Sequence, residues 1–173
     1  MGVNHRGEHK RRKTGAQAVI SRKKRNNRAG SQPSATKIGA RKVVAVRVRG
    51  GNKKQRALKL EEGHFRFMST GNIRKANMIQ VVYHPSSNEL VRTNTLTKSS
   101  VVKISAETFK EDVATVGAEQ DAELHEGFEK GHLYAIITSR PGQIGMAQGH
   151  VLQGEELKFY SERFNKKKGG ARK

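Results

Sequence analysis

The chain has 173 residues and carries 35 lysines and arginines against 15 aspartates and glutamates, a formal net charge of +20. It contains no cysteine, which excludes disulfide bonds, thiolate zinc sites and cysteine nucleophiles. The N-terminus lacks the apolar stretch of a secretory signal, and no apolar run approaches the length of a membrane span. We therefore expect an intracellular protein that does not enter a membrane.

The charge is distributed unevenly along the chain. Residues 1–59 hold 19 basic and 1 acidic side chains, residues 60–165 hold 11 and 14, and residues 166–173 hold 5 and none. Two cationic ends on a near-neutral body indicate a polyanionic partner, and clusters of this density favour nucleic acid.

Apolar residues divide the chain in a similar way. Leucine, isoleucine, valine and phenylalanine make up 4 of the first 42 residues but 32 of residues 43–165. The first segment cannot bury enough apolar surface to offset the conformational entropy of folding alone. We predict a basic arm over residues 1–42 that is extended and disordered when free, a folded body over residues 43–165, and a basic tail over residues 166–173.

The body begins with a predicted β-hairpin. Valines alternate with alanine and arginine from residue 43 to residue 48, and Gly50–Asn52 supplies the positive φ angles of a tight turn before the chain returns towards Leu60. Period-2 patterns and flanking turn residues predict further strands at residues 78–83, 89–97, 100–104, 133–138 and 150–152. Six or seven short strands joined by turns predict a mainly β fold, a small β-barrel or sandwich.

Two stretches predict short helices towards the C-terminus. In residues 106–131 apolar side chains recur at helical spacing, and Gly117 is expected to separate two pieces. This segment is acidic, so we do not expect it to contact nucleic acid. In residues 154–165, Leu157, Tyr160 and Phe164 form a stripe between an acidic first turn and a basic end, which suits the helix dipole. We expect this stripe to pack against the body.

The basic clusters predict contact with phosphates rather than with bases. Lys10–Lys13 and Arg22–Arg25 are dense runs of charge, and no aromatic residue occurs before Phe65. Modules that read single-stranded bases stack them on aromatic rings, and that platform is missing from the basic half. The alternatives are a solvated tail, a nuclear-import signal, or an edge strand protected by lysines. Two clusters plus a basic hairpin exceed what these roles require.

The candidate phosphate-binding residues are cations of the arm, the hairpin and one later turn. They are Lys10, Arg11, Arg12, Lys13, Arg22, Lys23, Lys24, Arg25, Lys37, Arg41, Arg47, Arg49, Lys53, Lys54, Arg56 and Arg140.

The chain contains only incomplete versions of known catalytic and cofactor-binding motifs. Gly149–Gly154 has the spacing of a phosphate-binding P-loop, but Glu155–Glu156 stands where lysine and serine or threonine are needed. His5 and His9 have helical spacing but lack the further ligands of a metal site, and Ser139 lacks the glycines of a nucleophile elbow. We predict no catalytic activity, no metal, no cofactor and no small-molecule substrate.

Several motifs together resemble one protein family. They are His9–Gly15, Thr36–Gly39, Val46–Lys54 with Arg56–Leu58, Asn88–Thr93 and Ser139–Gln143. These stretches, and their order from residue 9 to about residue 160, resemble the signature motifs of small-subunit ribosomal protein eight of archaea and eukaryotes, the S-eight-e family. Residues 151–160 resemble the helical extension of eukaryotic members. Eukaryotic members usually carry a long lysine-rich insertion where residues 106–131 of this chain are short and acidic.

The resemblance implies a β-barrel body whose extended N-terminal arm is threaded into small-subunit rRNA, without catalytic activity or a cofactor. It implies small-subunit rRNA and neighbouring small-subunit ribosomal proteins as partners. It implies a cytoplasmic location in the small subunit, with nuclear and nucleolar passage during assembly. The alternative from another class is a free nucleic-acid chaperone that binds duplexes without a fixed site; an enzyme acting on rRNA is disfavoured, because no acid–base or cofactor constellation is present.

Overall fold

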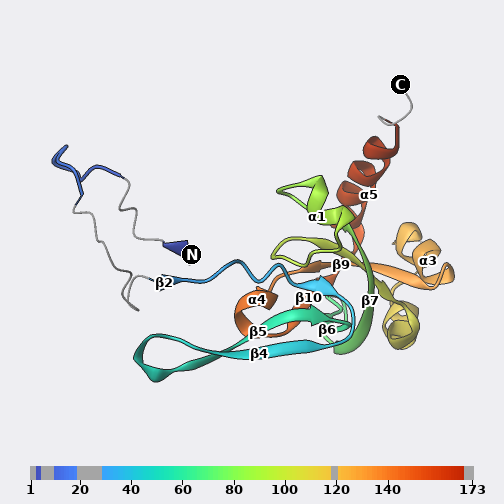
Figure 1. Cartoon of the computed structure of the whole chain (residues 1–173). Helices are drawn as coiled ribbons and strands as arrows, with labels where there is room; N and C mark the ends of the chain where they lie inside the picture. The colour runs from blue at the N-terminus through green and yellow to red at the C-terminus, as the bar shows by residue number, and fades with distance from the viewer. Residues whose placement is uncertain (1–2, 5–9, 19–28, 118–120, 170–173) are drawn as a thin grey trace.

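A closed five-stranded barrel forms the centre of the computed structural model, which describes residues 3–4, 10–18, 29–117 and 121–169 (Figure 1). Its strands are β6 (Glu62–Arg66), β7 (Ile73–Tyr83), β8 (Val101–Ser105), β9 (His132–Ile137) and β10 (Ala147–Val151). Consecutive strands pair antiparallel, and β10 closes the barrel by pairing in parallel with β6. The predicted mainly β fold with a small barrel is confirmed.

The barrel interior holds the apolar core. Alternate residues of β9 are buried, as period-2 side-chain geometry requires, and Phe65, Phe67 and Phe109 are fully enclosed. Burying a side chain of this size contributes about 1.5–3 kcal/mol. The helices of the described residues are all too short or too polar to cross a membrane.

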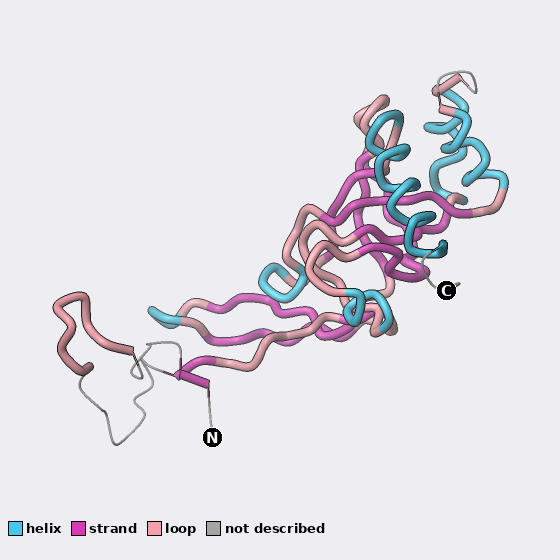
Figure 2. The backbone as a smooth tube through the Cα atoms, turned by 90° about the horizontal axis from the view of Figure 1, so that it is seen from above, coloured by secondary structure: helices cyan, strands magenta, loops and turns pink. Residues whose placement is uncertain are grey.

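A second sheet leaves the barrel as a ribbon. It contains β3 (Lys37–Ile38), β5 (Lys53–Leu60) and β4 (Lys42–Arg47), in that order. The antiparallel pair β4–β5 projects away from the barrel (Figures 1 and 2), and we call residues 42–60 the ribbon. Its tip is the 3-10 turn η2 (Arg49–Gly51), where Gly50 and Gly51 have φ angles of 76° and 80°. The predicted turn with positive φ angles is confirmed at both glycines, whereas Asn52 has a φ angle of −64°.

The N-terminal segment joins this sheet before the ribbon begins. Thr36 is 1% exposed, its hydroxyl donates to the carbonyl of Ala57 at 2.7 Å, and its own carbonyl accepts from the amide of Leu96 at 2.7 Å. Thr36 is therefore fixed to the body, although it lies inside the segment we assigned to the arm. Further towards the N-terminus, β1 (Val3–Asn4) pairs with β2 (Ala29–Gly30).

Helices cover the barrel at the side away from the ribbon. The turn η3 (Glu107–Phe109) and α2 (Lys110–Thr115) precede Gly117, and α3 (Ala122–Glu129) follows it, which confirms the two predicted helical pieces. The last helix, α5 (Gly154–Gly169), buries Leu157 and packs Tyr160 and Phe164 against the core, while Phe159 is exposed.

The predicted packing stripe of α5 is confirmed by ring contacts. The ring of Tyr160 lies 5.6 Å from that of Tyr83, and the ring of Phe164 lies 5.3 Å from that of Tyr134. Tilted pairs at such distances add about 0.5–1.5 kcal/mol to the gain from burial.

The strand predicted over residues 89–97 is wrong, because this segment begins with helix α1 (Asn88–Arg92). Ser87 caps the helix by accepting a hydrogen bond from the amide of Glu89 at 3.2 Å. Glu89 lies in the first turn and Arg92 in the last, so both charges match the helix dipole. Capping and charge placement thus outweigh the alternation of β-branched residues.

Candidate nucleic-acid interface

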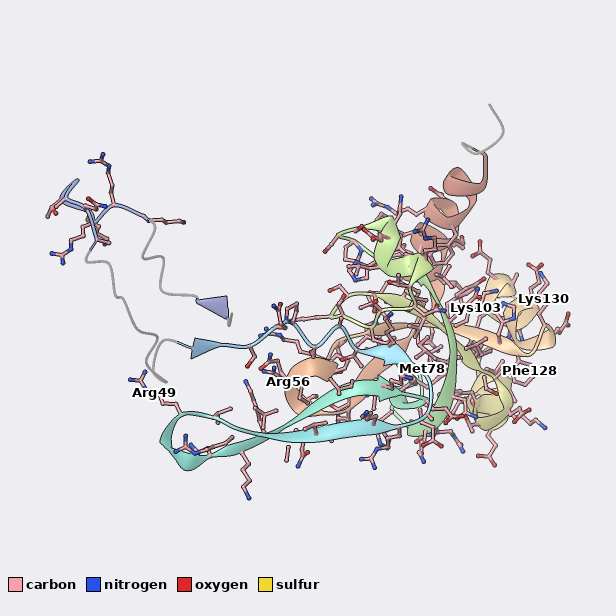
Figure 3. All side chains as sticks on the ribbon, in the orientation of Figure 1. Arg49, Arg56, Met78, Lys103, Phe128 and Lys130 are labelled. Atoms are coloured by element: carbon pink, nitrogen blue, oxygen red, sulfur yellow. The ribbon has the colours of Figure 1, made fainter. Side chains whose placement is uncertain are left out.

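The ribbon divides its cations between two faces. In the β4–β5 register Arg47 lies opposite Lys53, and Lys54 lies opposite Val46. Directly opposed residues share a face and sequence neighbours alternate, so Arg47 and Lys53 lie on one face while Lys54 and Arg56 lie on the other. The candidate cations of the ribbon are therefore divided between its two faces. Figure 3 shows Arg49 towards the tip of the ribbon and Arg56 nearer the barrel.

The two faces differ in exposure. Arg47 and Lys53 are exposed, whereas Lys54 and Arg56 are half-buried. The ammonium group of Lys54 donates to Oε1 of Gln143 at 2.6 Å, and Nε of Arg56 is buried without a hydrogen-bond partner in the described part of the chain. Near the tip, the side chains of Arg47 and Lys53 are therefore the open ones. Towards the barrel the same face is covered, because Val43 and Gln55 lie against Gly145.

Like charges oppose each other twice along the ribbon. Arg47 faces Lys53 near the tip, and Lys42 faces Lys59 near the barrel. Like charges placed directly opposite each other destabilise a sheet. Lys42 was not among the candidates from the sequence, and only the pairing of β4 with β5 identifies it as one half of a cationic pair.

No ribbon cation forms an ion pair with another described residue. The barrel behaves differently, because Arg74 pairs with Asp112 at 2.5 Å and Lys75 with Glu62 at 2.6 Å. Arg74 and Lys75 are thus neutralised within the protein, while the ribbon cations have no ion-pair partner among the described residues.

The Asp112 cluster holds the turn between β6 and β7 against α2. Asp112 is 1% exposed and accepts hydrogen bonds from Thr70 at 2.8 Å, Asn72 at 2.7 Å and Arg74 at 2.5 Å. Burial acts to raise the pKa of Asp112, but the hydrogen bonds from Asn72, Thr70 and Arg74 outweigh it, and its pKa lies below the ordinary value. The carboxylate is therefore ionised and serves structure rather than the interface.

The first basic cluster of the arm is displayed by a compact turn. Lys10, Arg11, Arg12 and Lys13 are all exposed. The guanidinium of Arg11 donates to the carbonyl of Gly15 at 3.1 Å, and the backbone amide of Arg12 donates to the carbonyl of Ala16 at 2.8 Å. The second predicted cluster, residues 22–25, lies outside the described residues.

The remaining candidates flank the ribbon. Lys37 on β3 and Arg41 just before β4 are exposed. Arg140 is exposed and immediately precedes α4 (Pro141–Ile144), a short helix in the segment where the sequence predicted a turn. The three-stranded sheet thus brings Lys37 and Arg41 together with the ribbon cations.

The acidic helices lie on the far side of the molecule from the ribbon tip. Figure 3 shows Lys103, Phe128 and Lys130 at the opposite end from Arg49. Lys130 pairs with Glu126 one helical turn away, and this hydrogen bond lowers the pKa of the glutamate. The separation of charge predicted from the sequence is therefore also a separation in space.

Within the described ranges, no group of three histidine, aspartate or glutamate side chains could hold a metal ion. His5 and His9, considered from the sequence as a pair of metal ligands, lie outside those ranges.

The chain is thus a basic protein with a closed barrel and a projecting ribbon, whose cations form no ion pair among the described residues. The family model of ribosomal protein S8e matches residues 5–152. The chain is similar to small ribosomal subunit protein eS8A of Saccharomyces cerevisiae, with 42% identity over 200 aligned residues that cover 97% of this chain and 100% of the relative. It is 43% identical to eS8A of Schizosaccharomyces pombe with the same coverage, and 45% identical to eS8 of Theileria annulata over 182 residues, 97% of this chain and 99% of the relative. The chain belongs to the ribosomal protein S8e family.

The aligned lengths also bear on the region that the sequence predicted to be shortened. Both 200 and 182 exceed the 173 residues of this chain, so these relatives carry additional residues. Their place at residues 106–131 stays a prediction.

Proposed function

We propose that this protein is a structural component of the small ribosomal subunit that binds small-subunit rRNA through phosphate contacts from its arm and ribbon. One observation carries the proposal: Arg47 opposes Lys53 and Lys42 opposes Lys59, with no carboxylate partner for any of them among the described residues. An RNA backbone supplies a regular row of anions that would relieve the repulsion in both pairs.

Membership of the S8e family supports the assignment to the small subunit, because the relatives bear the name small ribosomal subunit protein eS8. We infer a non-catalytic role in subunit assembly and translation, with neighbouring small-subunit proteins as further partners. The inferred location is the cytoplasmic small subunit, with nuclear and nucleolar passage during assembly.

The chemistry of the contacts follows from the side chains. Arginine can hold a phosphate through two parallel hydrogen bonds, whereas lysine acts as a point charge. At the tip, a Cβ added to Gly51 would meet nothing within 4 Å, so the backbone there is open to a phosphate. The arm over residues 1–42 would become ordered on binding, and its many phosphate contacts would offset the entropy that it loses.

Crosslinking with a reagent that joins lysine to RNA, followed by mass spectrometry of the attached peptides, tests the proposal in isolated small subunits. Peptides containing Lys53 or Lys10 should carry small-subunit rRNA. The acidic helix peptide that contains Lys110 provides the internal control, because Lys110 is exposed as well. Crosslinks at Lys110 but none on the ribbon or arm would contradict the proposed interface.

A further inference from the structure

The short helix α4 contacts both extensions that the proposed function assigns to RNA. It is fixed to the barrel, because Pro141 is buried and Ser139 ties the loop to β10. The Ser139 hydroxyl accepts from the amide of Gln148 at 2.8 Å and donates to the carbonyl of Met146 at 3.2 Å. These interactions hold α4 in place on the barrel, from which it makes its further contacts.

The first contact is with the root of the arm. A Cβ on Gly142 would lie 1.9 Å from Oγ and 3.1 Å from Cβ of Ser34. The φ angle of Gly142 is not positive, so close approach rather than backbone conformation requires a glycine here. A methyl group at position 142 would have to turn the Ser34 hydroxyl away and shift the Ser34 Cβ, two residues before the buried Thr36.

The second contact is with the ribbon. Gly145 has a φ angle of 81°, and a Cβ there would lie 2.6 Å from Cβ of Gln55 and 3.2 Å from Cγ1 of Val43. These residues belong to β5 and β4, and Gln143 of α4 also accepts the hydrogen bond from Lys54 at 2.6 Å. Figure 1 shows α4 beside the ribbon.

We propose that α4 is a positioning element that holds the root of the arm, at Ser34, in a fixed place relative to the ribbon, so that both extensions reach one RNA molecule at the same time. Gly142 and Gly145 are positioning residues that need not touch RNA. The inference rests on the proposed function and deepens it, because it predicts that the two sets of cations act as one bivalent site. Two linked sites bind far more tightly than either alone only when their geometry permits simultaneous engagement.

Two glycine substitutions test the proposal without changing any charge. Gly145→Ala should push α4 away from the ribbon, and Gly131→Ala is its matched control, because Gly131 has a φ angle of 75° and its Cβ would meet nothing within 4 Å. Gly142→Ala should displace the root of the arm, and Gly117→Ala is its control, with open space around its Cβ. Ser34→Gly removes the side-chain atoms that the new methyl group would meet, so the double variant Gly142→Ala/Ser34→Gly should restore binding.

The measurement is the affinity of each full-length variant for purified small-subunit rRNA, beside a generic duplex RNA and a thermal unfolding curve. Gly142→Ala and Gly145→Ala should each lose about tenfold in affinity for the rRNA, a part of the gain that bivalence provides. The two controls should bind as the unmodified protein does. All variants should bind the generic duplex equally, because no cation has been removed.

A double-mutant cycle separates positioning from simple loss of stability. Neutralising Arg47 and Lys53 should cost much less affinity in the Gly145→Ala background than in the unmodified protein, because the ribbon is then no longer engaged together with the arm. Equal costs in both backgrounds, or glycine variants that bind like their controls, would overturn the inference while leaving rRNA binding intact. An unmodified protein that prefers the rRNA no more than the generic duplex would overturn the proposed function and the inference together.

Discussion

Neutralising the two exposed cations near the ribbon tip should change binding and stability in opposite directions. The change is the double substitution Arg47→Gln and Lys53→Gln, at two exposed residues that oppose each other and have no ion-pair partner in the described part of the chain. Removing a directly opposed pair of like charges should stabilise the free protein by about 0.2–1 kcal/mol. The same change removes two of the cations proposed to bind phosphate.

The loss of binding can be worked from the number of contacts. Each phosphate contact contributes about 0.7–0.9 to the slope of log affinity against log salt, so two contacts contribute about 1.4–1.8. Over a fourfold rise in salt, from ~50 to ~200 mM, the unmodified protein should therefore lose about 7–12-fold more affinity than the variant.

The assay is a titration of small-subunit rRNA with full-length protein at several salt concentrations, with urea denaturation of both proteins alongside. The control variant, Lys110→Gln with Lys158→Gln, makes the same change in net charge at two exposed helical residues. A salt slope unchanged by Arg47→Gln/Lys53→Gln, or lowered equally by the control, would refute the assignment of these two residues.

Three further predictions concern the body. Burial lowers the pKa of His84, so just below pH 6.5 the unfolded state binds more protons than the folded state. The free energy of unfolding should therefore fall as the pH decreases from ~7 to ~5. A His84→Gln variant whose stability follows the same pH profile as the unmodified protein would contradict this. Asp112→Ala removes the acceptor of Thr70 and Asn72 and one of the two carboxylates that pair with Arg74, which keeps Glu111. It should cost about 2–3 kcal/mol in urea denaturation, and a loss below about 0.5 kcal/mol, the scale of surface changes, would contradict it. Thr36→Val removes the buried 2.7 Å hydrogen bond to the carbonyl of Ala57 and should lower the free energy of unfolding by about 1 kcal/mol. Amide exchange in β3 should become faster, and unchanged exchange there would show that other contacts hold β3.

The sequence predicted those strands whose pattern is local. Parts of β7 to β10 follow period-2 alternation of β-branched residues, and the predictions there are confirmed. Strand β6 was missed because Glu62–Arg66 has a single large apolar residue, Phe65, and a glycine that would count against a strand. Its Gly63 is needed because a Cβ would lie 2.8 Å from the Phe65 ring, a contact that no local pattern reveals.

The candidate interface likewise has features that the sequence predicted and features that only the fold reveals. Counting charges along the chain was sufficient to select Arg47, Lys53 and their neighbours. The division into two faces depends on the pairing of β4 with β5, whose register shifts between Lys42 and Val43. The contacts of α4 join residues about 90 positions or more apart, so spacing in the sequence could not predict the role of Gly145.

The central claim is that this chain is embedded in the small ribosomal subunit, and sedimentation tests it most directly. Cell extract is separated on sucrose gradients at increasing salt, and each fraction is probed for this chain. A loose electrostatic binder with six to ten phosphate contacts should lose about a thousandfold or more in affinity between ~50 and ~200 mM salt and move to the top of the gradient. We predict that the chain stays with the small-subunit peak well above that range. Its release from all particles at modest salt would contradict the claim and favour a free nucleic-acid chaperone.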